Sequence, residues 1–216
     1  MKKVLTITAC FLLFSAAVSG QAVRFGLTAS PVFSWTKLDY SAFERDGIKF
    51  GVKYGLLLDV NIGDMERYAF ATGITLTHNG GKFIARDTFL DVRTNMNMRL
   101  QYLDIPLTMK LKTNEANYMR YFGQIGIIPS FNIRARGDWT VETPTDSHTF
   151  ENEKIEAVNL FNLALSIGGG VEYIISDQTS LVGGIFFNNG FVNVVDDDDD
   201  DKITLLNLGI NISVLF

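Results

Sequence analysis

Residues 205–216 read LLNLGINISVLF, and this stretch decides the fold class. Every even position from Leu206 to Phe216 is apolar, whereas most odd positions carry asparagine, glycine or serine. Alternation of period two is typical of a β-strand whose two faces meet different surroundings. Terminal segments usually fray unless something ties them down. We therefore expect this strand to be paired inside a closed sheet.

The same alternation recurs along the preceding chain. Residues 47–62, GIKFGVKYGLLLDVNI, alternate over almost their whole length, whereas a strand of a soluble protein usually has roughly five or six residues. The other alternating stretches are residues 23–35, 68–78, 101–112, 118–134, 159–175 and 179–191. We expect short turns after Val60, Lys112 and Ile175, and long polar loops after Trp35, Leu76, Arg134 and Gly190. This alternation of short and long connections is typical of an up-and-down meander.

The beginning of the chain predicts export. Two lysines precede an apolar run that ends in small residues, which is the pattern of a secretory signal peptide. We expect residues 1–20 to be cleaved and residues 21–216 to form one domain. Cys10, the single cysteine, lies in the cleaved part, so disulfides and thiol chemistry are excluded from the mature domain. The net charge of −5 and the scattered cations give no sign of a nucleic-acid partner.

Periodicity alone leaves open which face points inward. A lipocalin-like soluble barrel buries its apolar face, whereas an outer-membrane barrel turns it toward lipid. Long strands, nearly unbroken apolar faces and an export signal favour lipid. The polar faces carry charges of both signs, and we expect these to form a lattice in the lumen, made of Lys53, Asp59, Asp104, Lys110, Arg120 and Glu172. An open sheet edge in hydrocarbon would leave backbone groups unpaired. The prediction is an all-β, eight-stranded antiparallel up-and-down transmembrane β-barrel.

Three segments that include alternating stretches given above resemble the PorT-like family of outer-membrane β-barrel proteins. They are LQYLDIPLTMKLK, YFGQIGIIPSFNIRAR and LALSIGGGVEYIISDQTSLVGGIFFNNGF. They are similar to the family's Y-L-E-I-P-L strand, glycine-rich strand and G-x-G-x-E-Y strand, with Asp104 where the family often has glutamate. The resemblance spans nearly the whole mature chain. It implies an outer-membrane barrel of the porin family, and some members support secretion or attachment of surface proteins.

Few residues suggest chemistry. The acidic run comprises Asp196, Asp197, Asp198, Asp199, Asp200 and Asp201. Clustered carboxylates can hold Ca²⁺ or Mg²⁺, but this run lacks the glycine turns of a calcium loop, so we expect a solvated loop tip. His78 and His148 are the only histidines. A rim-located lipid hydrolase would need one of them beside a serine.

The sequence therefore favours a non-enzymatic protein without cofactor or metal, in the outer membrane of a Gram-negative bacterium, with both termini in the periplasm. Its role is structural, interacting or secretion-supporting, through extracellular loops. The expected partners are outer-membrane lipid and lipopolysaccharide, the barrel-insertion machinery that reads Phe216 as an assembly signal, and a surface or secretion protein. The alternatives are a lipid-modifying hydrolase, a narrow channel and a soluble ligand-binding barrel.

Overall fold

The computed structural model describes residues 23–38, 43–45, 47–63, 67–87, 92–143, 145–195 and 203–216. These residues form strands and connections, and no helix among them could cross a membrane. The strands are β1 (Val23–Leu38), β2 (Phe43–Arg45), β3 (Lys49–Ile62), β4 (Tyr68–Asp87), β5 (Val92–Asp104), β6 (Leu107–Lys112), β7 (Met119–Glu142), β8 (Ser147–Lys154), β9 (Phe161–Ile174), β10 (Ser180–Gly190) and β11 (Ile203–Leu215).

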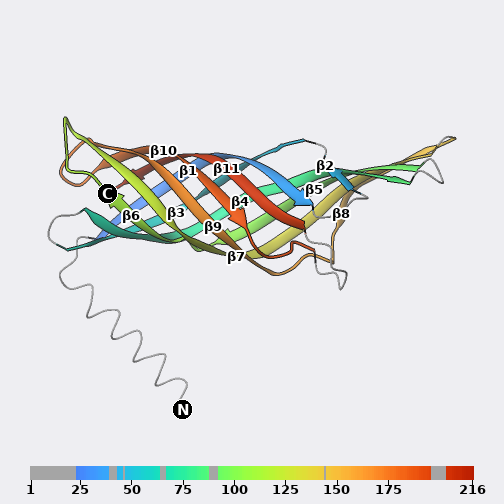
Figure 1. Ribbon diagram of the computed structural model, residues 1–216, viewed down its shortest axis with the longest axis horizontal. Coiled ribbons are helices and arrows are strands. Elements are labelled where there is room, and N and C mark those ends of the chain that lie inside the picture. Colours follow the sequence, from blue (N-terminus) through green and yellow to red (C-terminus); the bar gives the residue numbers. More distant parts are fainter. Residues whose placement is uncertain are drawn as a thin grey trace, which may run out of the picture.

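The strands close into a ring (Figure 1). β1 pairs antiparallel with β3 on one side and with β11 on the other. β5 and β6 share one place in the ring, between β4 and β7, because the chain is interrupted at Ile105 and Pro106. The ring order is thus β1, β3, β4, β5 with β6, β7, β9, β10 and β11. The eight-stranded up-and-down barrel predicted from the alternation is confirmed.

The side chains of the barrel are arranged inside out compared with those of a soluble protein. Apolar side chains on the outer face are strongly exposed, for example Phe25 at 64% and Ile185 at 64%. Charged side chains on the inner face are buried, for example Asp59 at 1% and Glu172 at 0%. This arrangement suits a wall surrounded by lipid. A lipocalin-like barrel would show the opposite arrangement.

Two hairpins extend the sheet far beyond the rest of the barrel. β4 and β5 form one of them, and β7 and β8 form the other, while β2 pairs with the outer part of β4. Figure 1 shows this extension on the right, at the end opposite the C-terminus. We name the two ends of the barrel the hairpin end and the terminus end. The sequence predicts long polar loops after Leu76 and Arg134, and this prediction is wrong, because strand pairing continues to Asp87 and Glu142.

Candidate functional site

The first group of buried charges lies in the lumen near the terminus end and is centred on Glu172. Its carboxylate forms an ion pair with Arg24, and its Oε2 lies 3.7 Å from the Nζ of Lys112. Arg24 Nη1 also donates to Ser180 Oγ at 3.2 Å, and Lys112 Nζ donates to Asn61 Oδ1 at 3.1 Å. Side chains from β1, β3, β6, β9 and β10 therefore form one polar network, in which Arg24 and Lys112 contact the Glu172 carboxylate and Ser180 and Asn61 contact these two cations.

A second pair joins β6 to β3. Lys110 Nζ donates to Asp59 Oδ2 at 2.5 Å, and both residues are buried. The same ammonium lies 5.1 Å from the centre of the Phe122 ring, which adds a cation–π attraction. A buried charge is tolerated only when a partner and further contacts compensate for its lost hydration. This pair meets both conditions.

A third group lies closer to the hairpin end. Thr77 Oγ1 donates to Asp104 Oδ2 at 2.5 Å. Lys53 lies close enough to Asp104 to interact with its charge, and Lys53 Nζ is 5.1 Å from the centre of the inward-facing Phe186 ring. Phe186 stands opposite two glycines, Gly168 and Gly209, on the neighbouring strands. The glycines leave room in the narrow lumen for an aromatic ring.

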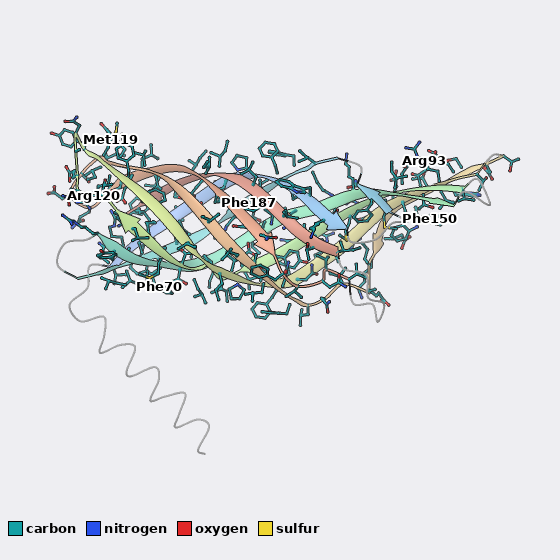
Figure 2. The ribbon with its side chains drawn as sticks, viewed as in Figure 1. Phe70, Arg93, Met119, Arg120, Phe150 and Phe187 are labelled. Atoms are coloured by element: carbon teal, nitrogen blue, oxygen red, sulfur yellow. The ribbon has the colours of Figure 1, made fainter. Side chains whose placement is uncertain are left out.

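The structure places all six residues of the predicted lattice on the inner face of the barrel. Arg120 lies at the rim of the terminus end, where it stands opposite Glu172 on β9 and pairs with Glu115 at 3.5 Å (Figure 2). Sequence reasoning missed Arg24 and Lys112 as members of the lattice. Both could have been found, because Arg24 lies on the polar face of the first alternating stretch and Lys112 follows Lys110 by two positions.

The space that remains in the middle of the lumen is small. Water has access to a volume of about 70 Å³, lined by polar residues that include Ser30, Lys53, Asp59, Lys110 and Gln124. A single buried water needs roughly 10–15 Å³ of such space. The cavity therefore has room for only a few water molecules among the paired charges. A narrow channel would need a lumen free of such pairs, and the described residues do not provide one.

An apolar cap closes the lumen at the hairpin end. Its buried members are Phe83, Met98, Leu100, Tyr102, Val194 and Leu205, with Ile155, Val158 and Ile203 packed against them. Val194 comes from the connection between β10 and β11 and is only 1% exposed. Backbone bonds hold it in place, since Val194 N donates to Ile203 O at 2.8 Å and Asn159 N donates to Val194 O at 2.9 Å. The cap is packed like the core of a soluble protein.

The polarity of the two faces is reversed in the hairpins. On β7, Phe131 and Ile133 face outward with exposed side chains, but Arg134 and Arg136 follow them on the outer side. The change coincides with a β-bulge between Gln101 and Tyr102, where β5 skips one residue of β7. On β5 and β7 the apolar outer surface therefore ends near this bulge, and polar side chains follow it. We name the cationic side chains on the outer face just beyond the bulge the basic belt: Lys82, Arg99, Arg134 and Arg136.

A polar network holds the hairpins to one another beside the basic belt. Asp138 Oδ1 accepts from Arg99 Nη2 at 2.5 Å and from the backbone N–H of Asn152 at 2.8 Å. Asn97 joins the network, since its Nδ2 donates to Asp138 Oδ2 at 3.4 Å and its Oδ1 accepts from Lys49 Nζ at 2.8 Å. The network connects β3, β5, β7 and β8. The extension is therefore a braced part of the sheet.

The inner face of the extension carries an aromatic patch, which we define as Met96, Trp139 and Phe150. Met96 stands opposite Trp139, and Trp139 stands opposite Phe150, with ring centres 6.3 Å apart. Met96 also packs against the cap. Phe150 is 46% exposed and lies far out on the extension (Figure 2). An exposed aromatic cluster on a rigid element can anchor a protein partner.

Comparison with known proteins agrees with this geometry. The outer membrane protein beta-barrel domain family matches residues 19–194. The chain belongs to this family. Membership places the protein in the outer membrane of a Gram-negative bacterium. No curated protein matches the chain.

Several solved structures of outer-membrane barrels cover most of this family member. Neisserial surface protein A shares 10% identity at a TM-score of 0.52, with 91% of this chain and 98% of that chain covered. OprG from Pseudomonas aeruginosa shares 9% identity at a TM-score of 0.46, with coverages of 91% and 97%. Ail from Yersinia pestis shares 12% identity at a TM-score of 0.33, with coverages of 88% and 97%. The likeness to the Neisserial protein shows the fold alone.

The two histidines make different contacts, one with an aromatic ring and one with a carboxylate. The ring of His78 stacks on Tyr54 with centres 5.7 Å apart. His148 Nε2 lies 3.1 Å from Asp146 Oδ2, and both side chains are largely exposed. Neither histidine hydrogen-bonds to a serine in the part of the chain that the structure describes. The arrangement required of a rim-located hydrolase is therefore not found there.

The remaining predicted sites concern metal binding and assembly. Asp196–Asp201 lie outside the described residues, so the cation prediction for this run stays a prediction. No group of three metal-ligating side chains occurs among the described residues. Phe216 exchanges two backbone bonds with Phe25, at 2.6 and 3.1 Å, and is 54% exposed. These bonds continue the pairing of β11 with β1, and the role of Phe216 as an assembly signal also stays a prediction.

Proposed function

We propose that this family member is a non-conducting, non-enzymatic platform whose hairpins bind a surface or secreted protein outside the cell. The observation that carries the proposal is the extension of the sheet past the level at which its outer face stops being apolar. A barrel that only strengthened the envelope would gain nothing from a braced sheet in water. Binding sites are precise when they are built on rigid elements, and Asp138 supplies the bracing.

The aromatic patch supplies the contact surface of the proposed platform. Tryptophan and other large side chains contribute most of the binding energy in protein interfaces. Trp139 and Phe150 belong to adjacent strands of one hairpin, and the partly exposed Phe150 ring is available to a partner. The resemblance to PorT-like proteins supports a surface or secreted protein as this partner. The lumen leaves too little room for a protein partner, because paired charges and the cap occupy most of it.

A matched pair of variants tests the partner site. Trp139→Ala with Phe150→Ala removes the patch, whereas Thr140→Ala with Thr149→Ala changes the opposite face of the same hairpin, where the two hydroxyls lie 3.2 Å apart. Cells carrying each variant are compared with wild type by mass spectrometry of surface-attached and secreted proteins. A photo-crosslinking residue at position 150 or at position 149 identifies the neighbour directly.

We expect a defined protein to crosslink from position 150 and to be lost from the surface in the patch variant only. Equal profiles for both double variants, with no adduct specific to position 150, would contradict the proposal. Folding of each variant is checked by the shift in gel mobility between heated and unheated samples.

The orientation of the barrel needs a separate test. The single cysteine lies at position 10, so introduced cysteines can be labelled selectively. We expect Thr149→Cys, in the hairpin, to react with a membrane-impermeant maleimide in intact cells. Asp177→Cys, in the turn between β9 and β10, should react only after the outer membrane is permeabilised. The reverse pattern would place the hairpins in the periplasm.

A further inference from the structure

The basic belt lies directly beyond the lipid-facing surface. Ile133 is 53% exposed on the outer face of β7, and Arg134 is the next residue. The bulge places Gln101 opposite Arg134 and Tyr102 opposite Asn132, so the outer face passes from apolar to cationic within one step of the ladder. Side chains at this level reach the headgroups of the surrounding lipid.

Strand pairing concentrates positive charge in the belt. Arg99 on β5 stands directly opposite Arg136 on β7, and Arg136 stands opposite Lys154 on β8. Like charges directly across a sheet are destabilising. Arg136 is partly satisfied, because its Nη1 donates to Asn152 O at 2.9 Å, but a carbonyl does not neutralise a guanidinium. Bound anions would therefore stabilise this arrangement by reducing the repulsion between the like charges.

Two cations in this region have acidic partners within the protein. Asp138 pairs with Arg99 at 2.5 Å, and Lys154 pairs with Glu156 at 3.2 Å. Lys82 and Arg134 are exposed and form no ion pair with any described residue. Arg99 itself keeps 47% of its side chain exposed despite its pairing. The belt thus retains donors that point away from the barrel wall at headgroup level.

We propose that the basic belt binds the phosphate groups of lipopolysaccharide in the outer leaflet. Arginine matches phosphate because its planar fork can donate two parallel hydrogen bonds to one group. The lipid A part of lipopolysaccharide places phosphates beside its acyl chains, which is the order of belt and apolar wall along β7. The inference rests on the proposed orientation, because only the outer leaflet contains this lipid.

The test measures lipid binding by the purified full-length barrel in detergent. Diphosphorylated lipid A, enzymatically dephosphorylated lipid A and phosphatidylglycerol are the probes, and native mass spectrometry reports the affinities. The belt variant is Lys82→Gln with Arg134→Gln. The control, Arg93→Gln with Arg120→Gln, removes the same charge from the distal part of the extension and from the opposite rim (Figure 2). Gel mobility confirms that each variant is folded.

We expect the belt variant to bind diphosphorylated lipid A at least about tenfold more weakly than wild type, since two charge-assisted contacts are lost. The control variant should stay within about twofold of wild type, and so should Lys82→Arg with Arg134→Lys, which keeps both positive charges and one guanidinium. Equal weakening by both glutamine variants would overturn the site. Equal wild-type affinity for the dephosphorylated lipid, or for phosphatidylglycerol, would overturn lipopolysaccharide phosphate as the ligand.

This outcome is separable from the proposed function. If position 149 is labelled from outside and the patch variant loses its partner while lipid binding is unchanged in the belt variant, the inference alone fails. If the belt variant loses lipid A while position 149 is protected in intact cells, the proposed orientation fails and the belt cannot meet lipopolysaccharide in the cell.

Discussion

Lys110 and Asp59 show what a polar lumen requires of single side chains. Burying either charge alone would cost free energy, because the charge would lose its hydration without gaining a partner. Together they form an ion pair that lies beside the Phe122 ring. Removing one member of a buried pair leaves the other uncompensated, which costs more than the pair contributes. Lumen charges are therefore sensitive to single substitutions and more tolerant of paired ones.

Asp59→Asn should lower the free energy of unfolding by about 3 kcal/mol, because Lys110 keeps a buried charge without its counter-ion. The double variant Asp59→Asn with Lys110→Met should recover most of this loss. Urea unfolding in lipid vesicles, followed by tryptophan fluorescence, gives both values. Glu115→Gln, in the exposed pair with Arg120, serves as control and should change stability by less than about 1 kcal/mol. A double variant as unstable as Asp59→Asn would contradict this account.

Gly170 matters for a steric reason. A Cβ on this residue would lie 2.2 Å from the backbone oxygen of Gly183 and 2.7 Å from the Cα of Gly184. Gly170→Ala should therefore lower the unfolding free energy by about 2 kcal/mol, because backbone atoms must move apart. Gly123→Ala is the matched control on β7, since nothing lies within 4 Å of its added methyl. Equal stability of both variants in the same unfolding assay would exclude close strand packing as the cause.

The hairpins show where a strand element can and cannot be predicted. Alternation identifies residues 101–112 and 118–134 because lipid and lumen demand opposite polarity over that length. From Tyr102 toward the hairpin end, the inner face is apolar and the outer face is polar. Leu100 and Met98 therefore face inward, whereas Arg99 faces outward. The bulge also shifts the parity of β7 against β5. A prediction that assumes one fixed apolar face therefore ends the strand at this point and assigns the following residues to a polar loop.

The candidate site also has parts that could be predicted from the sequence and parts that could not. The luminal residues follow from parity within one strand, which is why Asp59, Lys110 and Glu172 could be predicted. The cap could not, because Val194 belongs to a connection without periodicity and meets Leu100 only through the closed ring. The basic belt depends on the pairing of Arg99 with Arg136, which no local pattern reveals.

Val194→Lys tests whether the cap behaves as a unit. A buried ammonium among Met98, Leu100 and Leu205 has no counter-ion. The connection between β10 and β11 that carries it should therefore move out of the lumen into water. We expect faster hydrogen exchange and new proteolytic cleavage in residues 155–160 and 191–195, while the unheated barrel keeps its gel mobility. Thr149→Lys, on the exposed β8, should leave both measurements unchanged. Unaltered exchange in the Val194 variant would show that the cap is not cooperative.

At the scale of the whole molecule, the closed lumen predicts a barrel without conductance. Ion pairs cross the lumen at the levels of Glu172 and Asp59, and the cap covers its far end. An eight-stranded barrel has an interior that side chains can fill. The purified protein in a planar bilayer should therefore show no stepwise current under conditions in which a sixteen-stranded porin conducts. Stable single-channel steps that Asp59→Asn alters would contradict this prediction.

The seam between β1 and β11 constrains how the barrel inserts into the membrane and closes. Gly26 faces Leu215 across this seam, so the last contact of the ring joins segments that lie almost the whole described chain apart. Pairings of such long range form late. Until they form, the two edges expose backbone donors and acceptors that hydrocarbon cannot satisfy, and the luminal ion pairs have no enclosed interior. Insertion and closure are therefore coupled events, and a half-made barrel needs another surface to shield its edges until the seam is complete.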